Sequence, residues 1–191
     1  MLINDKLSDS NFIVLIMKKN NLASDIRTAT LEDAKAIAEN HIRSWQEMYK
    51  EFIPESILQE LSIEERTQQW SDLIKQKVKV LVIEVHHKIV GFASICAFRD
   101  DHGGGVKGEI SAIYLHPDYW RLGLGTKLCR AALSELSSSG YKTIYLWVLS
   151  DNYQARKFYE SLGFQVTGTT KMEEFYEGGA LLEEVLYMKK L

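Results

Sequence analysis

The sequence predicts an α/β fold in which helices cover both faces of a mixed β-sheet. Three observations support this prediction. Apolar residues recur at helical spacing between residues 34 and 75, β-rich runs begin at residue 78, and strand and helix patterns alternate from there to the C-terminus. With 191 residues, of which 46% are hydrophobic and 26% charged, the chain is long enough for one domain with a buried core.

Residues 1–25 are predicted to form an N-terminal extension, and residues 26–191 the folded domain. Met17 starts a stretch, MKKNNLASDIRTAT, that is typical of a native N-terminus. Residues 1–16 are therefore expected to be loosely ordered or to add an edge strand to the sheet. The apolar run at 12–17 is short and follows no positively charged segment, so it does not indicate a signal peptide.

Helix signals dominate the first part of the predicted domain. A short strand is expected at residues 26–29. Thr30 then provides a hydroxyl cap with an acidic residue three positions on, which predicts a helix with a buried apolar stripe. Pro54 opens a second helix, and Ser62 caps a third that runs to about Lys75.

From residue 78 the pattern changes to strands. The runs VKVLVIEV and IVGFASICAF, joined by His86, His87 and Lys88, predict a β-hairpin. A polar, glycine-rich loop follows at 99–108, and an acidic loop joins the last two strands. The later strands are expected at 109–115, 141–149, 164–170 and 181–189, with helices at 126–139 and 152–162 that end at Gly140 and Gly163.

Composition narrows the function. The net charge of -3 offers no extended positive surface for a nucleic acid. No apolar run approaches the roughly 20 residues that a transmembrane helix needs, so no membrane partner is expected. Cys96 and Cys129 form no CxxC pair, and both are expected to be reduced core thiols of a cytoplasmic protein. The acids and histidines near 86–87 and 100–102 lack a zinc-like spacing, so no metal site is expected.

The turn from His116 to Leu128 follows a predicted strand and opens a predicted helix. Its two glycines, Gly123 and Gly125, allow the backbone to approach an anion closely, and the N–H groups that open the helix would point at it. A phosphate site built from backbone is one interpretation, and an ordinary tight turn is the other. No Gly-Lys-Ser/Thr follows, which excludes a Walker A loop, and the glycine spacing excludes a dinucleotide fingerprint.

The run from Trp120 to Gly125 resembles the Q/R-x-x-G-x-G/A signature of the GNAT superfamily of N-acetyltransferases. Trp120 stands where that signature has Gln or Arg, and Arg121 beside it is expected to supply the missing charge. The segment from Asn152 to Phe164 resembles a second family motif, N-x-x-A-x-x-F/L-Y-x-x-x-G-F, and two motifs in the right order are more specific than one. The resemblance covers the predicted domain and implies the GNAT fold, whose central, mostly antiparallel sheet is splayed in the middle.

The same resemblance implies an activity, namely the acetyl-CoA-dependent transfer of an acetyl group to a primary amine by direct attack in a ternary complex. The acceptor would be a small-molecule or peptide amine, and a homodimer is compatible with the family. Two alternatives stay open. One is a non-catalytic module of the same fold that binds or senses acyl-CoA, and the other is transfer of a longer acyl group.

Coenzyme A contacts are implied along both motifs and along the strand before the first. In the family, the pantetheine arm pairs with that strand where the sheet splays, so backbone contacts are expected from Ile113 and Leu115. The N–H of Leu115 would hold the thioester carbonyl, whose oxygen becomes negative as the amine attacks. The implied contacts are Ile113, Leu115, Trp120, Arg121, Leu122, Gly123, Leu124, Gly125, Thr126, Asn152, Ala155, Phe158 and Tyr159.

Tyr159 matches the family tyrosine near the sulfur and is predicted to be the general acid, the alternative being a core aromatic. Asn152, at the start of the same helix, is a coenzyme contact, a helix N-cap or both. Glu109 is the candidate general base, because it occupies the place of the catalytic glutamate in the histone-acetyltransferase branch. A surface glutamate at a strand end is its alternative. By the period of two, Glu109 should share a strand face with Ser111 and Ile113.

Trp45, Tyr49 and Tyr176 are the candidate acceptor-binding residues. An aromatic ring beside a cationic amine offers cation–π attraction. Trp45 and Tyr49 are four residues apart on a predicted helix, so packing on the sheet is the alternative for both. Tyr176 lies in the acidic segment KMEEFYEGG, whose glutamates would attract an amine or face solvent.

Overall fold

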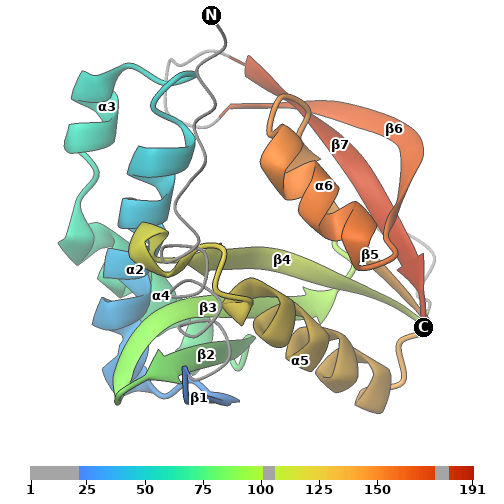
Figure 1. Cartoon of the computed structure of the whole chain (residues 1–191), viewed down its shortest axis with the longest axis horizontal. Coiled ribbons are helices and arrows are strands. Elements are labelled where there is room, and N and C mark those ends of the chain that lie inside the picture. Colours follow the sequence, from blue (N-terminus) through green and yellow to red (C-terminus); the bar gives the residue numbers. More distant parts are fainter. Residues whose placement is uncertain (1–21, 101–105, 175–180) are drawn as a thin grey trace, which may run out of the picture.

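The computed structural model describes residues 22–100, 106–174 and 181–191. Within these residues, seven strands form one sheet in the order β1-β2-β3-β4-β5-β7-β6 (Figure 1). The strands are β1 (Ser24–Thr28), β2 (Lys79–Val85), β3 (Lys88–Ala97), β4 (Lys107–Leu115), β5 (Thr143–Leu149), β6 (Gln165–Glu174) and β7 (Leu181–Lys190). The helices are α2 (Ala34–Met48), α3 (Glu55–Gln59), α4 (Ile63–Lys75), α5 (Leu124–Ser138) and α6 (Tyr153–Ser161), with 3₁₀ turns η1 (Leu31–Asp33) and η2 (Pro117–Tyr119).

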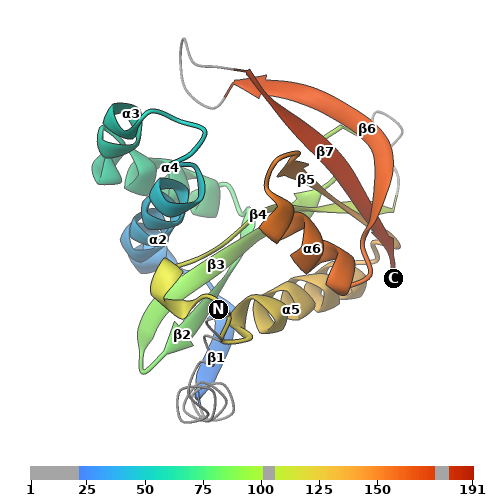
Figure 2. The same cartoon turned by 45° about the horizontal axis from the view of Figure 1, so that its top comes forward.

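The sheet is divided between β4 and β5. Every other neighbouring pair is antiparallel, whereas β4 and β5 run parallel and pair only from Lys107↔Thr143 to Glu109↔Tyr145. Beyond this short pairing the two strands diverge, and α6 lies beside the opening (Figure 2). The predicted sheet, mostly antiparallel and splayed in the middle, is therefore confirmed.

Helices cover both faces of the sheet because β2 buries side chains on both. Leu81, Ile83 and Val85 pack in the core that contains α5. The alternate residues Val80 and Val82 pack in a second core with α2 and α4. This alternation is the period of two along a strand. The predicted arrangement, with helices on both faces, is confirmed (Figure 2).

The predicted caps begin the first and third helical segments. The backbone N–H of Thr30 donates to Asp33 Oδ2 at 2.7 Å, and the Ser62 hydroxyl accepts from the N–H of Glu65 at 3.2 Å. Arg27 of β1 also holds Asp33, through bonds of 2.7 and 2.9 Å. The bonds from Arg27 lower the pKa of Asp33 to about 2. The start of the first helical segment is thus tied to the edge strand by an ion pair.

Several element boundaries differ from the predictions by a few residues. The first strand begins at Ser24, slightly earlier than expected. Residues 171–174, expected in the acidic loop, continue β6, because a β-bulge between Val166 and Thr170 lets the strand pair onward with β7. Residues 1–21 and Tyr176 lie outside the described residues, so the N-terminal extension stays a prediction.

Both cysteines are free thiols. Cys129 is fully buried in the core that contains α5, and burial raises the pKa of its thiol to about 12, which makes it unreactive. Cys96 is half-buried on β3. Across 22–100, 106–174 and 181–191, no helix combines the length and the apolar character needed to cross a bilayer.

Candidate active site

The open edge of β4 is the backbone feature of the site. Leu115 pairs with Gly91 of β3, and the neighbouring His116 N–H donates to the Val90 carbonyl at 2.8 Å. In an antiparallel ladder this alternation turns the N–H and C=O of Leu115, and of Ile113 two residues earlier, away from β3. They face the gap, because β5 has already diverged. An extended ligand can therefore pair with β4 here, as another strand would.

The carbonyl oxygen of Leu115 already has two donors. The Ser44 hydroxyl of α2 donates to it at 2.5 Å, and the indole N–H of Trp120 donates at 2.7 Å. With both lone pairs of the oxygen used, the backbone group that Leu115 still directs into the gap is its N–H. Trp120, which departs from the family signature, thus anchors the end of β4 to the glycine turn.

The glycine turn between η2 and α5 leaves backbone N–H groups unpaired within the helix at the N-terminus of α5. Gly123 is the N-cap of α5 with a φ of +83°, and Arg121 has a φ of +63°. At Gly125 a Cβ atom would lie 3.1 Å from a leucine side chain of β4, so the close approach favours glycine. The helix begins with the bond from Lys127 N–H to the Gly123 oxygen. The N–H groups of residues 124–126 therefore have no carbonyl partner within α5 and can bind an anion.

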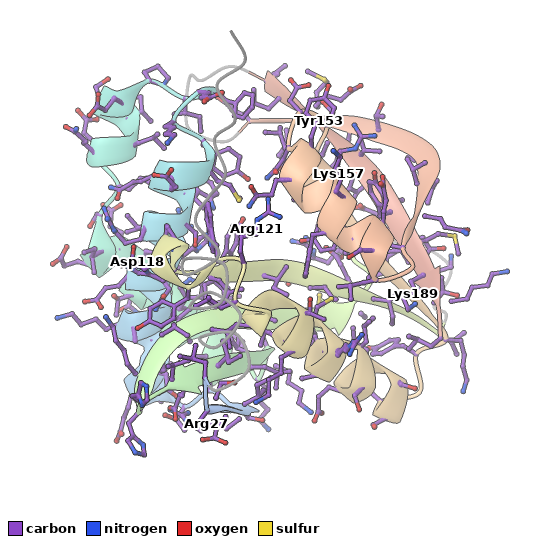
Figure 3. All side chains as sticks on the ribbon, viewed as in Figure 1. Arg27, Asp118, Arg121, Tyr153, Lys157 and Lys189 are labelled. Carbon is purple, nitrogen blue, oxygen red and sulfur yellow. The ribbon has the colours of Figure 1, made fainter. Side chains whose placement is uncertain are left out.

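A cavity of about 480 Å³ extends along the glycine turn, the end of β4 and α6. Arg121 of the turn and Lys157 of α6 are exposed side chains that line it, so two cations stand at its walls (Figure 3). The predicted coenzyme residues that line it are Ile113, Leu115, Trp120, Arg121, Gly123, Gly125, Thr126, Asn152, Ala155, Phe158 and Tyr159.

Two predicted coenzyme residues do not line this cavity with their side chains. Leu124 is buried in the core, and Leu122 packs against it, so only their backbone can face a ligand. Other lining residues lie outside the prediction, because they fill variable motif positions, adjoin predicted residues, or come from elements distant in the sequence. They are Ser44, Met48, Tyr114, Tyr119, Gln154, Lys157 and Ser161.

A second cavity, of about 320 Å³, adjoins the first. The residues that line both cavities are Met48, Ile113, Tyr114, Asn152, Ala155 and Tyr159. The cavities therefore meet where β4 and β5 separate. Two molecules bound in them would approach each other beside the Tyr159 phenol.

Trp45 and Tyr49 both line the second cavity. Their rings pack edge to face at 5.1 Å, and the guanidinium of Arg66 lies 5.5 Å from the Trp45 ring centre. The packing alternative is thus correct for both, and their place on the cavity wall is also what an acceptor-binding role needs. Tyr176, the third candidate, lies outside the described residues.

Tyr159 lies on the buried face of α6 and is 8% exposed. Its ring centre is 5.2 Å from that of Phe158 and 5.8 Å from that of Phe164, and burial raises the pKa of its phenol well above the ordinary value. Tyr159 is therefore a core aromatic as well as a cavity residue, and it keeps its proton at physiological pH. Asn152 caps the same helix, since its side-chain oxygen accepts from the N–H of Ala155 at 3.0 Å.

Glu109 is 1% exposed, so the surface alternative is wrong. Its carboxylate accepts from the backbone N–H of Arg99 at 3.0 Å and from the Arg99 guanidinium at 2.5 and 3.1 Å. These bonds raise the pKa of the Arg99 guanidinium. Glu109 lines the second cavity, where its role as general base stays a prediction.

Glu109 does not share a strand face with Ile113. A β-bulge between β3 and β4 inserts one extra residue, Ser111, into β4. As a result, Ile110 and Ile113 both pack toward α5, whereas Glu109 faces the opposite side of the sheet with Tyr114. The period-of-two prediction is wrong here because it assumes an unbroken ladder.

The sequence does not predict one further carboxylate of this cavity, Glu184 of β7. Lys171 of β6 lies 3.4 Å from Glu184 and 3.2 Å from Glu173, with its ammonium 4.7 Å from the Trp147 ring centre. Burial raises the pKa of Glu184, although Lys171 opposes this. Nothing local in the sequence marks Glu184, since its cavity exists only where the sheet is divided.

The sequence matches a known family over more than half of its length. Residues 42–164 match the model described as the Acetyltransferase (GNAT) family. The chain is 34% identical over 127 residues to the uncharacterized N-acetyltransferase YuaI of Bacillus subtilis, covering 66% of this chain and 72% of that protein. It is also 34% identical over 88 residues to the L-amino acid N-acyltransferase MnaT of Escherichia coli, covering 46% of this chain and 51% of that protein.

Solved structures share the fold. The PaiA N-acetyltransferase from Thermoplasma acidophilum, in complex with coenzyme A, has a TM-score of 0.69 at 20% identity and covers 89% of this chain and 100% of its own. The putative acetyltransferase yncA from Salmonella typhimurium, with its cofactor acetyl-CoA, has a TM-score of 0.67 at 22% identity. The match covers 88% of this chain and 94% of the yncA chain. These two likenesses show the fold alone. Together with the family model and the similarity to YuaI, they lead to one conclusion: this chain belongs to the acetyltransferase (GNAT) family.

Proposed function

We propose that this protein transfers the acetyl group of acetyl-CoA to a primary amine, by direct attack in a ternary complex. The observation that supports this most is the meeting of two cavities beside Tyr159. The first cavity has the glycine turn and the open edge of β4, and the second has carboxylates and aromatic rings. A donor and an acceptor can therefore lie beside one phenol at the same time.

Coenzyme A fits the first cavity, and it would supply an acetyl group already activated as a thioester. The N–H groups of residues 124–126, with the cations of Arg121 and Lys157, suit its phosphates. The backbone groups that Ile113 and Leu115 direct into the gap suit its extended, amide-containing arm. The absence of a side chain at Gly125 keeps the turn close to β4.

The N–H of Leu115 is proposed to donate to the thioester oxygen. Ser44 and Trp120 hold the Leu115 carbonyl from two sides, which restrains the end of β4 before any ligand binds. A donor that is already in place stabilises developing negative charge without reorganising during the reaction.

Tyr159 is proposed to protonate the departing sulfur. Burial keeps its phenol protonated because it raises the pKa. The same apolar surroundings would raise the pKa of a thiol held beside it, so burial affects the donor and the acceptor of the proton in the same direction. The place of Tyr159 on the wall of both cavities and its protonated phenol support the proposed role of general acid.

The acceptor is proposed to be a small-molecule or peptide amine that binds in the second cavity, against Trp45 and Tyr49. The relative MnaT is named for L-amino acid acceptors, so amino acids belong among the amines to be tried. The carboxylates of the cavity favour amines that arrive as cations.

The test is release of free coenzyme A thiol from acetyl-CoA by the purified protein. The panel contains putrescine, spermidine, benzylamine, L-methionine and a short peptide with a free N-terminus. We expect release that depends on the amine, with the acetylated amine identified by mass spectrometry. Tight coenzyme A binding without amine-dependent release would contradict the proposal and favour a sensor. Faster release from a longer acyl-CoA would favour a different acyl donor.

A further inference from the structure

We propose that Glu184 is the carboxylate that binds the ammonium group of the acceptor and takes its proton. This inference rests on the proposed function and adds to it the residue that activates the amine. Glu184 lies on β7 and lines the second cavity, which also contains Tyr159. Acceptor activation and sulfur protonation are thereby assigned to two different groups of one cavity.

The second cavity is suited to a cation. Its described lining residues include four carboxylates and two cationic side chains, so their formal charges sum to -2. Tyr159 in the same wall is 8% exposed, and its hydroxyl makes no hydrogen bond to the described residues. A buried phenol that has no partner among residues 22–100, 106–174 and 181–191 points to a ligand in the cavity. The charged groups counted are Glu109, Glu173, Glu174, Glu184, Arg99 and Lys171.

Glu109 is less suited to receive the proton than Glu184. Both of its oxygens accept hydrogen bonds from Arg99, at distances between 2.5 and 3.1 Å, and its side chain is 1% exposed. Protonation of Glu109 would break these bonds and leave the Arg99 guanidinium without its counter-charge. The structure therefore gives Glu109 the role of fixing the segment after β3 to β4.

Glu184 has capacity for a further hydrogen-bond donor. Its ion pair with Lys171 is long at 3.4 Å, and Lys171 divides its single charge between Glu184 and Glu173. The Glu184 side chain is 16% exposed, so a ligand can reach it from the cavity. An ammonium group that binds there supplies the positive charge that Lys171 alone does not.

The surroundings of Glu184 make its carboxylate a stronger base than that of an exposed glutamate. Burial is the largest influence on its pKa and raises it, while Lys171 and Arg99 lower it and Glu173 raises it. The charge of Glu184 also raises the pKa values of two phenols across the cavity. The groups that face it are Lys171 and Glu173 of β6, Arg99 after β3, Tyr49 after α2 and Tyr114 of β4.

The step assigned to Glu184 moves one proton. An N–H bond of the ammonium breaks, an O–H bond forms on the carboxylate, and the amine keeps the electron pair with which it attacks. The carboxyl group then releases the proton to water through the open side of the cavity. No oxidant, reductant or additional reactant is needed.

The first experiment compares E184Q with E183Q, using whichever amine of the panel the wild-type protein acetylates fastest. Glu183 is the next residue of β7, is exposed and does not line the cavity, so E183Q is a matched loss of charge. We expect kcat/KM for the amine to fall at least about 10²-fold in E184Q and to stay unchanged in E183Q. Coenzyme A affinity, measured by calorimetry without amine, should be equal in all three proteins.

The second experiment follows ionisation. The carbon-13 carboxyl signal of Glu184, identified by its loss in E184Q, should titrate above the range of exposed glutamates in the ligand-free protein. Lys171→Met should move this titration, and the acidic limb of kcat/KM, to higher pH, because the lysine favours the charged carboxylate. E184Q should lose that acidic limb.

Three outcomes would overturn the assignment. If the wild type is active and E184Q has the same kcat/KM as E183Q, the role of Glu184 is rejected and the proposed function stays intact. Loss of the acidic limb in E109Q, with the limb retained in E184Q, transfers the role to Glu109. A wild-type protein that binds coenzyme A but acetylates no amine rejects the proposed function, and the role of Glu184 with it.

Discussion

The indole N–H of Trp120 donates to the carbonyl oxygen of Leu115 at 2.7 Å. The Ser44 hydroxyl donates to the same oxygen at 2.5 Å, so one carbonyl joins α2, the end of β4 and the glycine turn. This relationship explains how a tryptophan can stand where the family signature has Gln or Arg. Its hydrogen bond holds the strand whose N–H faces the proposed thioester.

The two donors to Leu115 should be coupled. In Trp120→Phe or Ser44→Ala alone, the carbonyl keeps one donor, and each change should lower the free energy of unfolding by about 1 kcal/mol. In the double variant the half-buried carbonyl has neither side-chain donor, so the loss should exceed the sum by roughly 0.5 to 1 kcal/mol. Urea denaturation of the four proteins measures this cycle. Strict additivity would show that the two bonds do not share one function.

Arg121 should contribute to coenzyme binding and not to stability. Its φ of +63° strains a residue that has a side chain, and Arg121→Gly removes that strain. The same change raises the conformational entropy of the unfolded chain, which lowers stability. These effects oppose each other, so the free energy of unfolding should change by less than about 1 kcal/mol. Coenzyme A affinity should fall roughly 2- to 5-fold at low salt, and by less at high salt.

The control for Arg121→Gly is Arg130→Gln, which removes an exposed charge of α5 outside the first cavity. Its affinity for coenzyme A should match that of the wild type. If Arg130→Gln weakens binding as much as Arg121→Gly does, the effect comes from net charge and not from the position of Arg121.

Tyr159→Phe should lower turnover by about 10²-fold or more, because it removes the proposed proton donor while keeping the packed ring. Coenzyme A affinity should stay within about 2-fold, since the phenol makes no hydrogen bond to the described residues that its loss would disturb. Steady-state rates and calorimetry give the two quantities. Unchanged turnover with the best amine would exclude Tyr159 as the acid.

Asp33 should make stability depend on acid pH. Arg27 lowers the pKa of Asp33 to about 2 in the folded protein, whereas the unfolded chain takes up this proton near pH 4. The stabilisation is therefore complete above about pH 5 and is lost as pH falls toward about 2. The shift alone would correspond to about 2 kcal/mol, and exposure of the Arg27 side chain reduces the expected effect to about 1 kcal/mol.

Urea denaturation between pH 6 and pH 3 tests this dependence in the wild type and in Asp33→Asn. The variant should be less stable at pH 6, and the difference between the two proteins should shrink as the pH falls. A difference that stays constant across this range would mean that the Arg27–Asp33 pair contributes nothing that titrates.

Features set by neighbouring residues could be predicted from the sequence. The caps at Thr30 and Ser62 and the glycine turn that opens a helix at Gly123 follow from a few adjacent positions, and the structure has all three. Tyr159 lines the first cavity, and its position near the sulfur stays a prediction.

Two features set by contacts between distant strands could not be predicted, namely the sheet face on which Glu109 lies and the cavity that Glu184 lines. The bulge opposite β3 turned Glu109 to the other face of the sheet, and the division of the sheet gave Glu184 a cavity to line. Neither event leaves a periodic signal, because each depends on how two strands pair and not on either strand alone.

The short pairing between β4 and β5 leaves backbone N–H and C=O groups of β4 open to a strand-like partner. A molecule that fills the gap and bonds to β4 completes the architecture of the protein as well as reacting in it. Because such a molecule binds the folded chain and not the unfolded one, its concentration sets part of the protein's resistance to unfolding. The supply of acyl donor in a cell would then govern how long this protein persists, in addition to how fast it works.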